Sequence, residues 1–281
     1  MALRACIALP FLLLGVAAPA AAAGDTRVAA LQVALHARGL YQGTIDGISG
    51  PRTTRAVLAY QRRAGLTRDG VAGPQTFASL GGQARLGARV LALGMHGLDV
   101  AALQFALAAH GFPSGTFDGA FGPRTRAALR RFQRWAGLGA DGRAGPATVA
   151  TLSGPTPRCP VRLVRPLGAR VGDLFGPRGA GFHAGIDFVA SMGTGIAAAG
   201  PGYVSWAGWR DGGWGYLVVV AHGRGVRSMY AHLSRVEVRL GERVGAGFEL
   251  GRVGATGHAT GPHLHFEVRV RGAAVDPLGC F

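Results

Sequence analysis

Histidine and aspartate residues with the spacing of a metal site lie in the C-terminal part of this 281-residue chain. His183 and Asp187 form an H-x-x-x-D motif, and His263 and His265 form an H-x-H motif. Side chains alternate between the faces of a β-strand, so an H-x-H pair on a strand presents both rings on one face. With His232 between the two motifs, in MYAHLS, these residues indicate a zinc site that supports hydrolysis.

A hydrolytic zinc ion takes three nitrogen or oxygen ligands from the protein and keeps one position open for water. His183, Asp187 and one histidine of the H-x-H pair supply such a set. The other histidine and His232 then remain for acid–base and electrostatic roles. Bound zinc lowers the pKa of its water to about 7 and polarises a carbonyl group, so the pattern predicts metal-assisted hydrolysis.

The segments around these motifs are short and β-rich, and glycine-containing turns separate them, as in YLVVVAH, RSMYAHL and HLHFEVRVRG. We therefore expect a mostly antiparallel β-sheet domain over residues 161–281. The segment SGPTPRCP precedes it and is rich in proline. We expect residues 154–160 to be a linker.

The N-terminal half contains one sequence unit twice, because residues 28–80 align without a gap with residues 100–152, an offset of 72 residues. Apolar residues at helical spacing, Asp-Gly turns and Gly-Pro pairs divide each copy into three helices. We expect two small all-α modules of three helices each, at residues 26–82 and 88–153.

Both copies resemble the peptidoglycan-binding domain family, which is a small three-helix module. The shared pattern joins LQ, DG.FG, an aromatic-Gln pair and a second DG..G..T, and the aromatic-Gln position holds Tyr60-Gln61 and Phe132-Gln133. The resemblance implies that peptidoglycan is a partner. Because Asp-Gly is turn chemistry and Phe132 suits a core, a pair of spacers without affinity is the alternative.

The C-terminal part resembles the M23 (lysostaphin-type) family of zinc endopeptidases. The matching stretches are GFHAGIDF, GTGIAAAGPGYVSWAG, YAHLS, ATGHATGPHLHFEV and the trailing VDP. The resemblance implies one zinc ion held by His183, Asp187 and His265. It also implies that His263 is the general base and that His232 stabilises the oxyanion of the intermediate.

Three further residues lie near these motifs. Glu267 lies two positions after His265, where it would orient this ligand or simply follow the alternation of a strand. His222 suits either a strand end beside the site or a turn. Tyr216 stands where the M23 family often has asparagine, and we expect it to be structural.

Together the resemblances imply a zinc-dependent endopeptidase that hydrolyses stem peptides or cross-links of peptidoglycan while two modules hold it on the wall. The main alternative is a catalytically silent regulator of the same fold. Such relatives have lost metal ligands, whereas all five positions are filled here. A purely adhesive protein would have no use for the metal set, and a glycosidase needs a carboxylate pair that is not evident.

The first 23 residues have the pattern of a secretory signal peptide, with Arg4, an apolar run from Ile7 to Val16 and small residues up to Ala23. An uncleaved anchor is the alternative, but the run is short for a membrane-spanning helix of about 20 residues. We expect a secreted or cell-wall-associated protein, periplasmic in a cell with an outer membrane, with no stable membrane anchor after cleavage.

The net charge of +16 comes from arginine alone and favours binding to polyanions. The arginines are dispersed and no nucleic-acid-binding motif is evident, so we expect anionic cell-envelope polymers as partners and not nucleic acid. Beyond the signal segment only Cys159 and Cys280 remain. In an exported protein such a pair predicts a disulfide, with two free thiols as the alternative.

Overall fold

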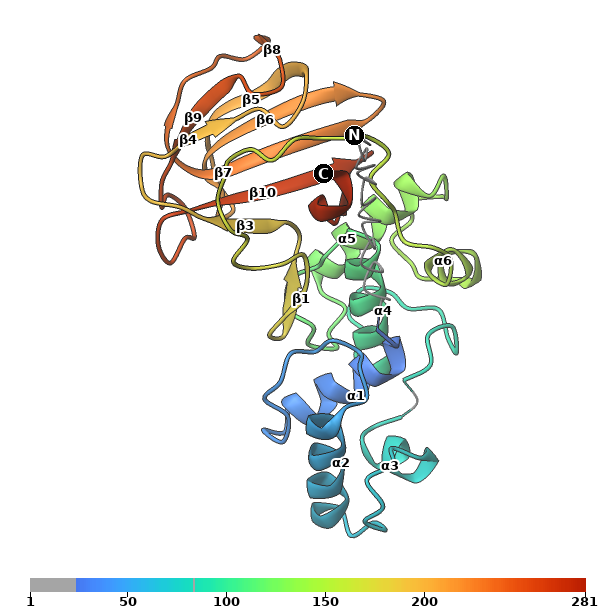
Figure 1. Cartoon of the computed structure of the whole chain (residues 1–281). Coiled ribbons are helices and arrows are strands. Elements are labelled where there is room, and N and C mark those ends of the chain that lie inside the picture. The colour runs from blue at the N-terminus through green and yellow to red at the C-terminus, as the bar shows by residue number, and fades with distance from the viewer. Residues whose placement is uncertain (1–23, 83) are drawn as a thin grey trace, which may run out of the picture.

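The computed structural model describes residues 24–82 and 84–281, and the expected signal peptide at residues 1–23 lies outside them. In the described residues, six α-helices are followed by eleven strands and a short 3-10 helix (Figure 1). This order confirms the predicted succession of helical modules and a β domain. Across these residues, no helix combines the length and the apolar character that a membrane span requires.

The two sequence repeats form two modules of three helices. They are α1 (Thr26–His36), α2 (Pro51–Arg63) and α3 (Pro74–Ser79), then α4 (Leu98–Ala109), α5 (Pro123–Trp135) and α6 (Pro146–Leu152). Four of these helices begin with proline, which suits a first turn because its missing N–H would have no partner there. Helix α1 packs against α4, and the two modules share an apolar cluster.

Buried glutamines hold the Asp-Gly turns of the modules in place. Gln133 on α5 donates from Nε2 to Asp141 Oδ1 at 2.8 Å, and its Oε1 accepts from Gly142 N at 2.9 Å. The same arrangement occurs around Gln32, Gln61 and Gln104. The glutamines of the repeat therefore act within the fold, where their side chains are almost fully buried.

Leucine in place of Gln133 is expected to lower the free energy of unfolding by about 1–3 kcal/mol, because the buried Gly142 amide loses its acceptor. Denaturant unfolding measures the change. The matched control is Gln75→Leu on the exposed side of α3, for which we expect a change below about 0.5 kcal/mol. Equal changes in the free energy of unfolding for the two substitutions would show that the buried hydrogen bonds of Gln133 do not stabilise the module.

The β domain is built from antiparallel pairs. Its strands are β1 (Gly176–Arg178), β2 (Gly181–His183), β3 (Ile186–Val189), β4 (Gly195–Ala197), β5 (Gly202–Arg210), β6 (Gly215–Gly223), β7 (Val226–Val236), β8 (Arg243–Val244), β9 (Glu249–Val253), β10 (His263–Val270) and β11 (Ala273–Val275). The main sheet has the order β11-β10-β7-β6-β5-β8, with β3 paired to β10 and β9 paired to β7 and β4. Fully buried Tyr230 and Phe266 belong to its apolar core.

A disulfide joins Cys159 to Cys280, as the sequence predicted, with the two Cα atoms 5.4 Å apart. Cys280 ends the 3-10 helix at Pro277–Cys280. The bond therefore ties the segment that enters the β domain to the last residues of the chain. It spans 121 residues of sequence, and a loop of this size contributes about 4–5 kcal/mol in the chain-entropy description.

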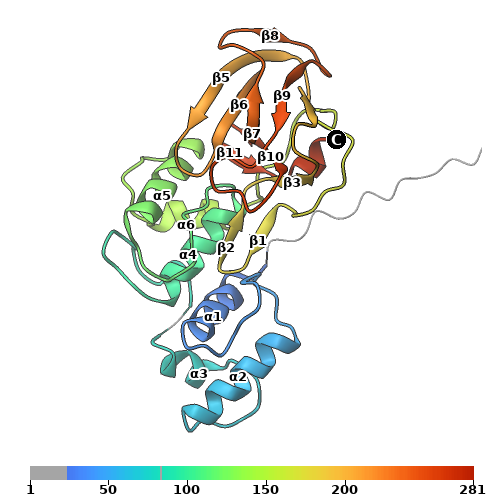
Figure 2. The same ribbon diagram turned by 90° about the vertical axis from the view of Figure 1, so that its left-hand side faces the viewer.

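The β1–β2 hairpin reaches away from the sheet to the two modules (Figures 1 and 2). Gly179 O accepts a hydrogen bond from Ile45 N at 2.9 Å, and Ala180 O accepts one from Phe117 N at 2.7 Å. Ile45 and Phe117 occupy equivalent positions of the sequence repeat. Each module thus binds one of two successive carbonyl groups at the tip of the hairpin, whose second strand ends at His183.

Candidate metal centre

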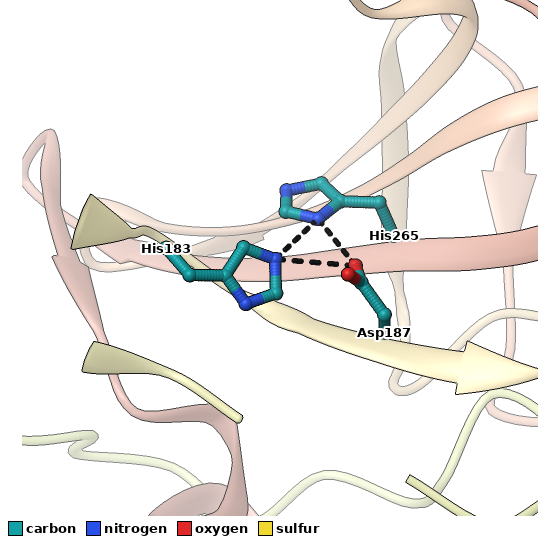
Figure 3. Close-up of side chains that lie close together, drawn as sticks. All are labelled: His183, Asp187 and His265. Carbon is teal, nitrogen blue, oxygen red and sulfur yellow. Dashed lines mark hydrogen bonds and ion pairs between the residues drawn. The ribbon is translucent and has the colours of Figure 1, made fainter. Parts of the chain in front are cut away.

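The three residues expected to bind metal come together at one end of the β domain (Figure 3). His183 ends β2, and the pairing of β3 with β10 sets Asp187 directly opposite His265. His183 Nε2 lies 3.0 Å from His265 Nδ1 and 3.2 Å from Asp187 Oδ1. His265 Nδ1 lies 2.8 Å from Asp187 Oδ1. The three side chains thus direct one potential ligand atom each to a common point.

These distances suit a tetrahedral zinc site, in which ligand atoms about 2.0–2.1 Å from the ion are about 3.3 Å from one another. The second nitrogen of each ring also has a partner. His183 Nδ1 is 2.9 Å from Leu174 O, and His265 Nε2 is 3.2 Å from Glu267 Oε1. An N–H donated to these oxygens leaves a lone pair on His183 Nε2 and on His265 Nδ1, which is the arrangement of metal-binding histidines.

The charges within the group favour a bound cation. Burial acts to raise the pKa of Asp187, but hydrogen bonds with His183 and His265 outweigh it and hold this pKa far below its usual range. Burial acts to lower the pKa of His265, but Asp187 and Glu267 raise it to about 9. A metal ion bound here would replace the proton that these carboxylates attract to His265.

The other two expected site residues lie beside this group. The ring centroids of His232, on β7, and His263, on β10, are 4.8 Å apart, and His263 Nε2 is 3.9 Å from Asp187 Oδ1. Their Nδ1 atoms are each 2.8 Å from a carbonyl oxygen, that of Thr256 for His232 and that of Gly261 for His263. An N–H donated from Nδ1 leaves the lone pair of a neutral imidazole on Nε2.

His232 has two further features of a functional residue. Its φ angle of 65° lies in the left-handed region, which a residue with a Cβ rarely adopts and which is enriched at functional sites. Burial, aided by repulsion from His263, lowers the pKa of His232. This ring is therefore neutral near pH 7.

The site lies in a cleft of about 740 Å³ whose lining includes His232, His263 and His265. Trp214 and His258 also line it, and the sequence motifs did not single them out. Arg178 is a third such residue, with Nη1 3.4 Å from Asp187 Oδ2. Only His258 carried a signal, because it lies within the stretch ATGHATG that matches the M23 pattern.

The structure also shows what surrounds Glu267, His222 and Tyr216. Glu267 is buried against His265, which favours the orienting interpretation. His222 bonds to Pro201 O and to Ser228 Oγ, both at 2.8 Å. Tyr216 donates its backbone N–H to Thr256 Oγ1 at 3.0 Å, on the loop that also positions His232.

Fold and site together define a metallopeptidase-type β domain that follows two helical modules. Comparison with known families agrees. Residues 181–277 match "Peptidase family M23", and residues 24–80 and 96–152 match "Putative peptidoglycan binding domain". The chain therefore contains a peptidase domain of family M23 and two peptidoglycan-binding domains, which confirms both resemblances.

Curated relatives match about a third of the chain. The DD-carboxypeptidase/endopeptidase Mpg of Neisseria meningitidis serogroup B is 44% identical over 96 residues, which are 34% of this chain and 22% of the relative. Lysostaphin of Staphylococcus simulans is 39% identical over 103 residues, 35% of this chain and 21% of the relative. The matches thus span about a fifth of the length of these relatives.

Among solved structures, the catalytic domain of lysostaphin from Staphylococcus simulans has 35% sequence identity. The match covers 39% of this chain and 90% of that one, with a TM-score of 0.38.

Proposed function

We propose that this chain is a zinc-dependent endopeptidase that hydrolyses stem peptides or peptide cross-links of bacterial peptidoglycan. The observation that carries the proposal is the complete group of His183, Asp187 and His265 in an M23 domain, with His232 and His263 beside it. The names of two relatives, DD-carboxypeptidase/endopeptidase and peptidoglycan DD-endopeptidase, favour a peptide bond of peptidoglycan as the substrate.

In this proposal the domains keep the expected boundaries, with modules at residues 26–82 and 88–153, a linker at 154–160 and the peptidase at 161–281. The modules hold the enzyme on peptidoglycan. The protein acts outside the cytoplasm in this proposal, as a secreted, wall-associated or periplasmic protein. A disulfide such as Cys159–Cys280 is stable in such compartments.

His183, Asp187 and His265 would hold one zinc ion, which supplies an activated water and polarises the scissile carbonyl. His263 would accept the proton of the attacking water on Nε2, an assignment supported by the position of its Nδ1 2.8 Å from Gly261 O. His232 presents a lone pair on Nε2 for the same reason. It therefore has to take up a proton on this atom before it stabilises the oxyanion by a hydrogen bond.

The test is digestion of purified peptidoglycan sacculi by the protein beginning at Gly24, with zinc, and with His265→Ala in parallel. We expect the wild-type protein to release fragments with new peptide amino termini, identified by mass spectrometry, and the variant to release none. If the wild-type protein binds zinc and sacculi but releases nothing, the regulator alternative replaces the proposal.

A further inference from the structure

A second hollow lies outside the metal centre, where the β domain meets the second module. The β10–β11 hairpin docks there, with Ala274 N donating to Gly111 O at 3.0 Å and with Ala273 in the apolar core of the module. Beside this contact is a groove of about 280 Å³. Its lining comes from both parts of the chain: Phe112, Arg131, Arg134, Trp135, Arg271 and Gly272.

Three arginines give this groove a positive charge that no carboxylate balances. Within residues 24–82 and 84–281, Arg131, Arg134 and Arg271 form no ion pair with an acidic side chain. Arg131 donates to a backbone carbonyl at 3.3 Å, and Arg271 to another at 3.4 Å. Desolvation, and then repulsion from Arg269 and Arg134, lowers the pKa of Arg131. An anion in the groove would relieve this repulsion.

Arg269 connects the groove with the cleft of the metal centre. It follows His265 and Glu267 on one face of β10, and its Nε is 2.7 Å from Glu267 Oε2. Its guanidinium carbon lies 5.9 Å from the ring centroid of Trp214, which lines the cleft. Its charge also acts on Arg131 of the second module. Arg269 therefore lies within reach of both regions, with its own charge paired to Glu267.

We infer that this groove binds free carboxylate groups of peptidoglycan stem peptides, next to the segment that lies in the cleft. The inference rests on the proposed function and adds a binding site to it. Guanidinium groups pair with carboxylates through two parallel, charged hydrogen bonds. The uncharged hydroxyl and amide groups of peptidoglycan do not offer such a pair. Trp135 and Phe112 supply an apolar wall for the aliphatic part of the peptide. Because the groove needs both parts of the chain, one polymer strand contacts the module and the peptidase domain together.

The experiment compares Arg131→Gln/Arg134→Gln with a matched control, Arg124→Gln/Arg126→Gln. All four arginines are exposed residues of α5, so both variants lose the same charge from the same helix. Binding of the full protein to sacculi is measured at fixed salt with a chelator present, so that no digestion occurs. The sacculi are used before and after attached anionic polymers are stripped from them, and the stripped sacculi are used either untreated or with their carboxylates amidated.

On untreated sacculi we expect the groove variant to bind about tenfold more weakly than the control variant, because charged hydrogen bonds are lost. On amidated sacculi we expect the two variants to bind alike. Equal binding on untreated sacculi, or a difference that amidation leaves unchanged, would overturn the inference. A difference seen only before stripping would do so too, since it would assign the groove to phosphate polymers. These outcomes do not depend on hydrolysis, so the proposed function is judged separately.

Discussion

Alanine in place of His263 is expected to leave zinc bound while hydrolysis of sacculi slows by about 10²–10⁴-fold, the usual contribution of a general base. The ring of His263 borders the metal group without belonging to the set of three ligand atoms, and its Nε2 is 3.9 Å from Asp187 Oδ1. Its removal therefore leaves the three ligands in place. His265→Ala removes one of the three proposed ligands, and we expect it to lose both zinc and activity.

Zinc content after dialysis and the initial rate of peptide release separate these two variants. Loss of zinc from His263→Ala would show that this residue is a ligand, contrary to the proposed assignment. An unchanged rate with zinc retained would show that another group accepts the proton. His232 would then be the candidate, because it also presents an Nε2 lone pair beside the site.

The helical modules and the H-x-H pair were accessible from the sequence because local rules determine them. Asp-Gly turns and Gly-Pro helix starts act over a few residues, so they mark the three helices of each repeat. The H-x-H spacing places His263 and His265 on one face of any strand. What brings Asp187 opposite His265 is the register of β3 against β10, which only the resemblance to a known family could supply.

Interactions between the domains were not predictable, because they join distant segments whose side chains have no distinctive type. The groove needs Arg131 beside Arg271, two of 30 arginines that are dispersed along the sequence. The proton arrangement of His232 was also hidden. It follows from the position of Thr256 O. We therefore expect this histidine to accept a proton on Nε2 before it can donate a hydrogen bond to the oxyanion.

Glutamate in place of Ala180 is expected to lower the affinity for zinc by about tenfold, although Ala180 lies outside the metal centre. Its carbonyl accepts the Phe117 N–H, and its side chain packs against the apolar cluster that the two modules share. Ala180 is half-buried, so a carboxylate at this position would be partly desolvated against apolar side chains, which disfavours the docked hairpin. Because β2 runs from Gly181 to His183, release of the tip loosens one ligand. Loss of support around a ligand commonly costs about 10–100-fold in metal affinity.

The matched control is Ile48→Glu, which adds the same charge to an apolar residue that is 60% exposed on the first module. Zinc affinity is measured by competition with a chelator, and thermal unfolding of the wild-type protein and both variants shows whether the modules and the β domain melt together. Zinc affinity and melting like those of the control would mean that the modules only tether the peptidase domain. A loss confined to Ala180→Glu means that the equivalent residues Ile45 and Phe117 set the position of His183 through the hairpin. The contact between the modules and the hairpin would then support the geometry of the metal centre.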